Sequence, residues 1–294
     1  MSRATPGLIV GWLLVSLLSG CDFAGAQADR QVAEGLALVQ AGRYSEGVTR
    51  FEQAIATKPT HAQAHYLLGV VRLQHLNAAS RSVENLQRAS ELSPRDAEAA
   101  YQLGVAYQQT EQRIQAIEAF RSAASRDPQH AGAHYRLGVM YEATGDYMGA
   151  IEAFSRAIQA DPEMALAYSR LANIYVMFGE RETGLAVLNV AAQYNPDDGS
   201  VRADMGRIAF DAQDYHGAIR ELERAVELGE QQPGTMMTLG LSYLRRHERS
   251  GDTADRERAL NALQRAAAGC NPQRDGGRCA AIGELLSELR APQR

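Results

Sequence analysis

The sequence predicts an all-α fold, a right-handed superhelical solenoid of about seven helical hairpins closed by a C-terminal capping helix. The first observation is a repeat of about 34 residues in this 294-residue chain, marked by prolines at intervals of 35, 34, 34 and 34 residues: Pro59, Pro94, Pro128, Pro162 and Pro196. The second is that each repeat carries two apolar periods of helical spacing. Repeats of this length cannot bury their apolar faces alone and must stack on their neighbours.

One repeat shows the hairpin pattern. Within residues 131–164, a first helical period of apolar residues ends at Thr144-Gly145-Asp146, a group suited to a turn. A second period runs from Tyr147 to Ile158, and Asp161-Pro162 ends it. The repeat is therefore predicted to be two antiparallel helices.

Three residue types recur at fixed positions in the repeats. The first helices carry a central glycine: Gly35, Gly69, Gly104, Gly138, Gly206 and Gly240, with Ala172 in its place once. The second helices carry a large apolar residue, followed by alanine three residues later: Phe51, Leu86, Phe120, Phe154, Leu188, Leu222 and Leu263. Because glycine inside a helix costs about 1 kcal/mol relative to alanine, its recurrence predicts close helix packing at these sites.

The pattern resembles the tetratricopeptide repeat over residues 28–273. The fourth repeat reproduces nearly all of that family's signature: Leu137-Gly138, Tyr141, Gly145, Tyr147, Ala150, Phe154, Ala157 and Pro162. The first repeat departs at Gln31 and Glu34, where the family has bulky apolar residues, and this suits a polar outer cap. The resemblance implies a protein-binding groove along the inner side of the first helices.

The seventh repeat differs from the others. It contains about seven extra residues within Arg245 to Arg258, and this mixed-charge stretch is predicted to be a longer, solvated loop rather than a docking element. After it, Asn271 to Gly277 are predicted to form a turn, and residues 274–294 to form a capping helix and tail. Cys270 and Cys279 are predicted to form a disulfide that pins this helix, with two free thiols as the alternative.

The first 20 residues are predicted to be a cleaved export signal. An apolar run from Leu8 to Leu18 is too short to span a membrane, and Leu18-Ser19-Gly20-Cys21 resembles the lipobox of bacterial lipoproteins. That resemblance implies lipid attachment at Cys21, followed by a short linker over residues 21–27. The alternative is an ordinary secretory signal with an incidental cysteine. We expect a protein anchored in the bacterial envelope and facing the periplasm, with the choice of inner or outer membrane left open.

Composition argues against nucleic-acid binding. Without residues 1–20 the chain has 274 residues, of which 29 are basic and 35 acidic, for a net charge of −6. It contains no concentrated basic patch of the kind that neutralises phosphates. One solenoid domain accounts for the mature chain, with its repeats over residues 28–273 and no obvious interdomain linker.

The best metal-binding candidates are two matching histidine pairs, His61/His65 and His130/His134. Each pair is two ligands short of a zinc site, and the pairs lie two repeats apart. We therefore expect helix-start and packing roles for them, and no metal, cofactor or small-molecule substrate. The sequence also lacks a metalloprotease motif, a phosphate-binding glycine loop and a nucleophile elbow, so we expect no catalysis.

The candidate binding residues occupy the fifth and ninth positions of successive first helices. Three consecutive repeats present the same aromatic and β-branched pair: Tyr66 and Val70, Tyr101 and Val105, Tyr135 and Val139. Tyrosine is favoured at interfaces because it brings a large area and a hydroxyl at low entropic cost. The alternative is that the tyrosines only fill gaps between repeats. Asn173 and Arg207 then replace the valine, which predicts a partner that is apolar at one end and acidic or hydrogen-bonding at the other.

These observations predict a non-catalytic, lipid-anchored scaffold for protein assembly in the envelope. The architecture resembles lipoproteins that help to assemble type IV pilus secretins and related secretion systems, and adaptors that gather cell-wall enzymes. A periplasmic chaperone for unfolded clients is the alternative from a different class.

Overall fold

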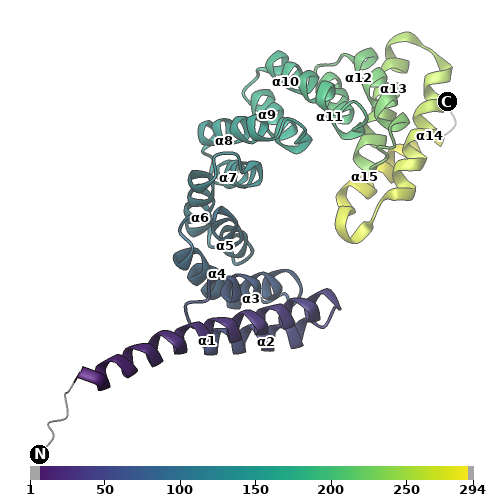
Figure 1. Ribbon diagram of the computed structural model, residues 1–294. Coiled ribbons are helices and arrows are strands. Elements are labelled where there is room, and N and C mark those ends of the chain that lie inside the picture. The colour runs from purple at the N-terminus through teal and green to yellow at the C-terminus, as the bar shows by residue number, and fades with distance from the viewer. Residues whose placement is uncertain (1–6, 291–294) are drawn as a thin grey trace, which may run out of the picture. The chain divides into compact units, whose positions relative to one another are not determined.

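The computed structural model describes residues 7–290, with side chains from Phe23 onward. This part of the chain forms fifteen α-helices and no strand (Figure 1). The helices are α1 (Gly7–Gln40), α2 (Tyr44–Thr57), α3 (Ala62–Gln74), α4 (Ala79–Leu92), α5 (Ala97–Gln109), α6 (Arg113–Arg126), α7 (Ala131–Thr144), α8 (Tyr147–Ala160), α9 (Ala165–Met177), α10 (Arg181–Tyr194), α11 (Gly199–Asp211), α12 (Tyr215–Glu227), α13 (Pro233–Ser250), α14 (Thr253–Gly269) and α15 (Pro272–Arg290). The predicted all-α class is confirmed.

The chain divides into two compact units, residues 1–146 and 147–294. The first unit contains the hairpins α1–α2, α3–α4 and α5–α6, followed by α7. The second contains α8, the hairpins α9–α10, α11–α12 and α13–α14, and then α15. Within each unit, every hairpin packs on the next one along the chain.

The recurring glycines lie where the two helices of a hairpin touch. A Cβ atom built on Gly104 would lie 2.6 Å from the ring of Phe120, and one on Gly69 would lie 2.5 Å from Leu86. Gly206 stands in the same relation to Leu222, also at 2.5 Å. Real Cβ atoms do not approach this closely, so the packing reason predicted for these glycines is confirmed.

The core of each hairpin is formed by the large apolar residue of its second helix. All seven members of this series are fully buried: Phe51, Leu86, Phe120, Phe154, Leu188, Leu222 and Leu263. The alanines three residues later are also buried, so that the helices can approach each other. The predicted core series is confirmed at every repeat.

The turn within each hairpin needs one residue with a left-handed backbone. Glycine supplies it at Gly42, Gly145 and Gly179, where φ is +75°, +79° and +84°. The equivalent residues in the other turns, Asn77, Glu111 and Gln213, also have positive φ. The turn conformation is therefore retained where glycine is absent, although side chains with a Cβ pay a steric cost there.

The predicted long loop over residues 245–258 is wrong. The extra residues lengthen two helices instead, so that α13 has 18 residues and α14 has 17, joined by Gly251 and Asp252 alone. Gly251 ends α13 with a left-handed backbone at φ +76°, and the Asp252 side chain accepts a hydrogen bond from the backbone N–H of Ala254. The glycine that ends α13 and the aspartate that caps α14 form a tight turn, which the mixed charges of this stretch did not indicate.

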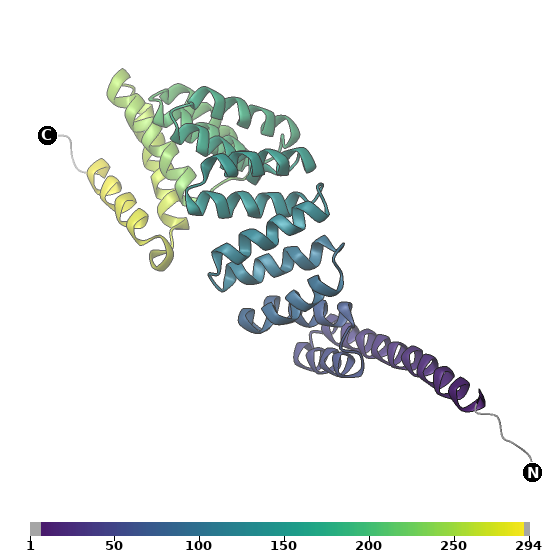
Figure 2. The ribbon, with the colours of Figure 1, turned by 90° about the vertical axis from the view of Figure 1, so that its left-hand side faces the viewer.

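The C-terminal helix also starts earlier than predicted. Helix α15 begins at Pro272, and the expected turn over residues 271–277 is reduced to a kink at Asp275, where φ is −119° and ψ is 26°. Ile282 and Leu286 are buried in the apolar cluster of α13 and α14, and Leu285 and Leu289 pack against that cluster. Helix α15 lies beside the last hairpin (Figure 2), as expected of a capping helix.

Candidate functional site

The predicted tyrosine stripe lies in the first unit, on α3, α5 and α7. Tyr66, Tyr101 and Tyr135 are each half-buried, as are the valines one turn further along each helix, Val70, Val105 and Val139. Each of these side chains therefore has both a packed part and an exposed part. We call these six residues the tyrosine stripe.

Part of the stripe closes the gap between neighbouring hairpins. Tyr66, Val70 and Val105 pack against a buried cluster that includes Leu73 and Leu103. This contact supports the packing role that the sequence left open. This packing leaves part of each side chain at the surface, because the residues stay partly exposed.

Two tyrosines of the stripe have defined neighbours. The Tyr101 ring lies 5.8 Å from the ring of Phe120 and 4.8 Å from that of His130, measured between centroids, so it links α5 to α6 and to the start of α7. Burial, with smaller contributions from the Glu98 and Asp96 charges, raises the pKa of Tyr66 to about 12. The Tyr66 hydroxyl, like that of an ordinary tyrosine, is protonated at neutral pH and can donate a hydrogen bond.

The polar pair Asn173 and Arg207 lies in the second unit. The Arg207 guanidinium donates a hydrogen bond to the Asn173 side-chain oxygen and so joins α9 to α11. It also lies 3.4 Å from Asp204 and 3.8 Å from Asp211. Two carboxylates therefore balance the Arg207 charge. Of the two predicted kinds of partner segment, this favours one that forms hydrogen bonds here over one that is acidic.

The four candidate histidines have structural contacts. His61 Nδ1 accepts a hydrogen bond from the backbone N–H of Ala64, and His130 Nδ1 does the same for Ala133, so both residues cap a helix. His65 and His134 each place Nε2 3.0 Å from a proline carbonyl oxygen. Within the described part of the chain, no three His, Cys, Asp or Glu side chains lie close enough together to hold a metal ion.

The structure shows a buried ion pair that the sequence reading missed. Asp255, with no exposed surface, accepts two hydrogen bonds from Arg246, at 2.7 and 2.6 Å, and lies 3.3 Å from Arg258. Hydrogen bonding to Arg246 holds the pKa of Asp255 below its usual range, against the opposing effect of burial. A nine-residue spacing across two helices gives no periodic signal, so pattern reading did not find the pair.

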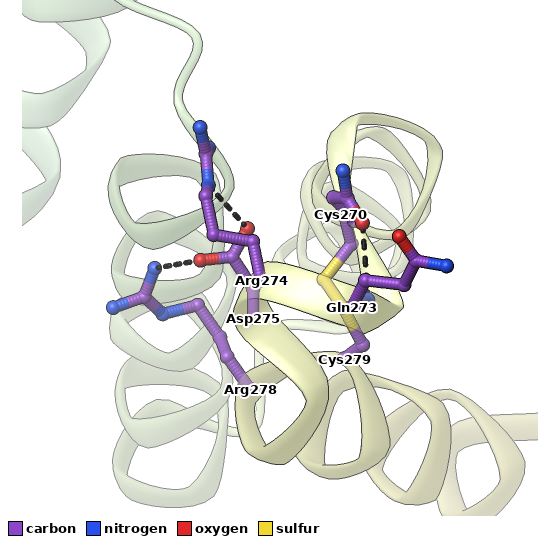
Figure 3. The surroundings of a disulfide bond; sticks show 7 residues. Cys270, Gln273, Arg274, Asp275, Arg278 and Cys279 are labelled. Carbon is purple, nitrogen blue, oxygen red and sulfur yellow. Dashed lines mark hydrogen bonds and ion pairs between the residues drawn. A yellow bond between two sulfur atoms is a disulfide. The ribbon is translucent and has the colours of Figure 1, made fainter. Parts of the chain in front are cut away.

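The structure joins Cys270 and Cys279 by a disulfide, with an S–S distance of 2.01 Å (Figure 3). The bridge spans the kink at Asp275. The Asp275 carboxylate forms ion pairs with the guanidinium groups of Arg274, at 3.4 Å, and Arg278, at 3.7 Å. It therefore ties the end of α14 to the capping helix.

We expect this bridge to form in an oxidising compartment and to contribute about 2.5 to 3 kcal/mol to stability by closing a short loop. Trypsin without reduction should release peptide 266–274 linked to peptide 279–290, and reduction should separate them in the mass spectrum. Replacing both cysteines by serine should lower the stability of α15 by a similar amount. Alkylated, unlinked peptides from the unreduced protein would show that the thiols are free.

The predicted signal segment and Cys21 precede the residues whose side chains are described, so lipid attachment stays a prediction. The backbone of α1 runs unbroken through residues 21–27. Among the residues that the structure describes, no helix combines the length and apolar character needed to cross a membrane.

The chain is similar in fold to several solved structures. A tetratricopeptide repeat protein from Parabacteroides merdae ATCC 43184 has a TM-score of 0.61 and 15% identity over 90% of this chain and all of its own. PilF of Pseudomonas aeruginosa has a TM-score of 0.58 and 17% identity, covering 72% of this chain and 96% of its own. A MamA structure has a TM-score of 0.53 and 23% identity, covering 55% and 94%. At these identities the likeness shows the fold alone.

No curated protein matches the sequence. Two family models, both described as tetratricopeptide repeat, do match: one over residues 32–79 and 109–165, the other over residues 141–208. The matched segments contain four members of the buried large apolar series, Phe51, Phe120, Phe154 and Leu188. The chain belongs to the tetratricopeptide-repeat family.

Proposed function

We propose that this protein is a non-catalytic scaffold that binds a protein partner through the inner face of its first helices. The observation that carries the proposal is the tyrosine stripe, in which the same aromatic and β-branched pair stays partly exposed on three successive first helices. A side chain needed only for packing would gain by being fully buried. Partly exposed tyrosines on a rigid helical support instead resemble the anchors of protein interfaces.

We expect that replacing Tyr101 and Tyr135 by alanine together weakens partner binding by about tenfold or more, as for interface anchors. The measurement is crosslinking in native membranes, followed by purification and quantification of the main crosslinked protein. Tyr194→Ala is the matched control, because Tyr194 is an exposed tyrosine on a second helix, α10. Unchanged capture by the double variant, with an intact circular dichroism spectrum, would leave the stripe a packing role only.

The proposed setting is the bacterial envelope, with a lipid on Cys21 holding the scaffold at the membrane. The support is the lipobox-like sequence Leu18-Ser19-Gly20-Cys21 after a short apolar run. A single acyl chain binds a membrane only marginally, whereas several chains give stable anchoring. Assembly of a surface machine of the pilus or secretion type is the proposed role there.

We expect Cys21→Ser to abolish membrane attachment, since the residue that would carry the lipid is lost. When cells are fractionated, the variant should be missing from the membrane fraction as a lipidated protein. It should be found instead as an uncleaved precursor or as soluble protein, and it should no longer incorporate labelled palmitate. The Cys270→Ser, Cys279→Ser variant is the control and should keep its label. Equal palmitate labelling of Cys21→Ser would rule out this anchor.

A chaperone for unfolded clients has one observation in its favour. The second unit exposes several large apolar side chains, among them Met148, Met177 and Phe178, with the Phe178 ring packed edge-on against Tyr147 at 5.6 Å. Flexible methionines suit loose, sequence-tolerant contacts. The same crosslinking experiment separates the two functions: one dominant partner supports the scaffold, whereas a broad set of clients supports the chaperone.

A further inference from the structure

The capping helix α15 is held on the second unit by few noncovalent contacts. Of its 19 residues only two are buried, Ile282 and Leu286. Leu285 and Leu289 add partly buried apolar contacts to the same cluster. Among the described residues, one polar contact links α15 to the preceding helices, a hydrogen bond from the Arg256 guanidinium of α14 to the Leu289 carbonyl oxygen. A small apolar patch and one hydrogen bond therefore supply most of the noncovalent attachment.

The segment between the two bridged cysteines has little support from the rest of the protein. We call residues 271–278 the hinge segment, and all of them except Asp275 are exposed. A Cβ atom built on Gly276 or on Gly277 would lie in open space. The Asp275 carboxylate pairs only with two arginines of the hinge segment itself. Because glycine has more conformational freedom than any other residue, this segment can change its path at low steric cost.

The disulfide joins the two ends of the hinge segment. Cys270 follows the last residue of α14, and Cys279 lies in the part of α15 beyond the kink (Figure 3). The bridge holds the two Cα atoms 5.8 Å apart, so α15 cannot move away from α14 while it is intact. Both cysteines are partly exposed, which leaves the bridge open to attack by a thiol. The position of the cap therefore depends on a bond that a reductant can break.

A dithiol is the class of reductant that opens this bridge. One of its thiolates attacks a sulfur of the bridge, the S–S bond breaks, and a mixed disulfide forms. Its second thiolate then displaces the attached cysteine, so that the reductant becomes a disulfide and Cys270 and Cys279 receive two electrons and two protons as thiols. At about 3.3 Å per extended residue, the hinge segment can then span roughly 25 Å.

A displaced α15 leaves an apolar surface that its own sequence fits. In the closed chain, α15 packs on α14 and adds Ile282 and Leu286 to the buried cluster of the last hairpin. Without α15, part of that cluster contacts water, which is unfavourable. A second copy of the chain carries a helix that matches this surface residue for residue, namely its own α15. Mutual exchange restores the same contacts in both copies and gives a closed two-fold dimer.

We propose that the Cys270–Cys279 bridge locks the capping helix onto its own chain, and that reduction of the bridge lets two copies of the protein exchange α15. Cys279 moves with α15 and so arrives beside Cys270 of the other copy. Reoxidation then forms the same cysteine pairing between chains instead of within one. The proposal does not involve the tyrosine stripe, and either one can fail without the other.

The test mixes equal amounts of unlabelled and ¹⁵N-labelled protein, each purified from cells in detergent. Dithiothreitol reduces the mixture, and glutathione disulfide then takes back the two electrons of each bridge and is released as two thiols. Trypsin without reduction releases peptide 266–274 linked to peptide 279–290. Exchange of α15 predicts linked pairs of one light and one heavy peptide, with a mass between the two unmixed pairs. Their share should rise with protein concentration, and a mixture that was never reduced should contain none.

Two variants separate exchange of the cap from random thiol exchange. Ile282→Asn keeps both cysteines and the hinge segment but removes a fully buried contact of α15, so it should give few light–heavy pairs. Glu284→Gln is the matched control, because Glu284 is exposed on the same helix, and it should give as many pairs as the unchanged protein. Hydrogen exchange of α15 should accelerate about a hundredfold on reduction, the shift expected from opening so short a loop.

Several results would overturn the proposal. An absence of light–heavy pairs at every protein concentration would show that each cap returns to its own chain, even if hydrogen exchange of α15 accelerates. Equal yields of light–heavy pairs from Ile282→Asn and the unchanged protein would assign them to random thiol exchange. Free thiols at both cysteines before reduction would show that there is no lock to open.

Discussion

Arg246→Ala is expected to lower the free energy of unfolding of the second unit by about 3 to 5 kcal/mol. The substitution leaves the Asp255 carboxylate buried between α13 and α14 without its two hydrogen bonds from Arg246. Arg258 remains 3.3 Å away and offsets part of the loss. Removing one partner of a buried pair costs more than the pair itself contributes, since the remaining charge has neither water nor a full set of partners.

The neighbouring Arg245 provides the control for this experiment. Its ion pair with Glu248 is exposed on both sides, so Arg245→Ala should change stability by less than about 1 kcal/mol. Urea unfolding followed by circular dichroism, with hydrogen exchange of α13 and α14, gives the comparison. Equal losses of unfolding free energy in the two variants would mean that burial of Asp255 does not make its ion pair more important for stability than an exposed one.

The Asp255 pair also predicts a dependence of stability on pH. Because the pKa of Asp255 is lower in the folded state, the unfolded state binds more protons at acidic pH than the folded state does. The stabilisation by the ion pair is therefore fully present above the unfolded pKa of about 3.9. It is lost as the pH falls through the folded pKa. In Asp255→Asn, this contribution to acid unfolding should be absent, which the same urea titrations at pH 7 and below pH 4 would show.

Phe120→Ala is the second large effect, with an expected loss of about 3 to 5 kcal/mol in the first unit. The Phe120 ring is fully buried and fills the space above Gly104, whose missing side chain leaves room for it. It also contacts Tyr101 of the stripe, with ring centroids 5.8 Å apart. Removing the ring leaves a cavity that the glycine cannot fill, so the α5–α6 hairpin should open first.

The control for Phe120 lies on the same helix. Ile114 is 72% exposed, and Ile114→Ala should change stability by about 0.5 kcal/mol or less, as for surface positions. Hydrogen exchange should show loss of protection confined to α5 and α6 and their neighbours, because each repeat contacts only adjacent ones. A uniform loss of protection across both units would contradict this local response.

The roles of the recurring residues were predictable because the same residue types pack against each other in each repeat. Gly104 and Phe120, for example, are complementary in volume, and the pair recurs as Gly69 with Leu86 and Gly206 with Leu222. A pattern that repeats at a fixed period identifies both the helix pair and its contact points without coordinates. The left-handed turns at Glu111 and Gln213 were harder to predict, since no glycine marks them.

The candidate sites were only partly predictable. The tyrosine stripe follows from spacing, because equivalent positions of repeats lie on equivalent faces. The unpaired Nδ1 of His65 does not, because His134 occupies the same position with the same proline contact. Only the structure shows that Nδ1 of His65 is buried without a hydrogen-bond partner.

The sequence alone determined the helical hairpins, their number, their buried seam and the family, because those features depend on local periodicity and on volumes that recur every 34 residues. The tertiary structure decided what the charged residues do. Arg246 meets Asp255 across α13 and α14, and Arg207 lies near two carboxylates on its own helix. The energy of a charge depends on its burial and on its nearest partners in space, and neither is written in a residue pattern.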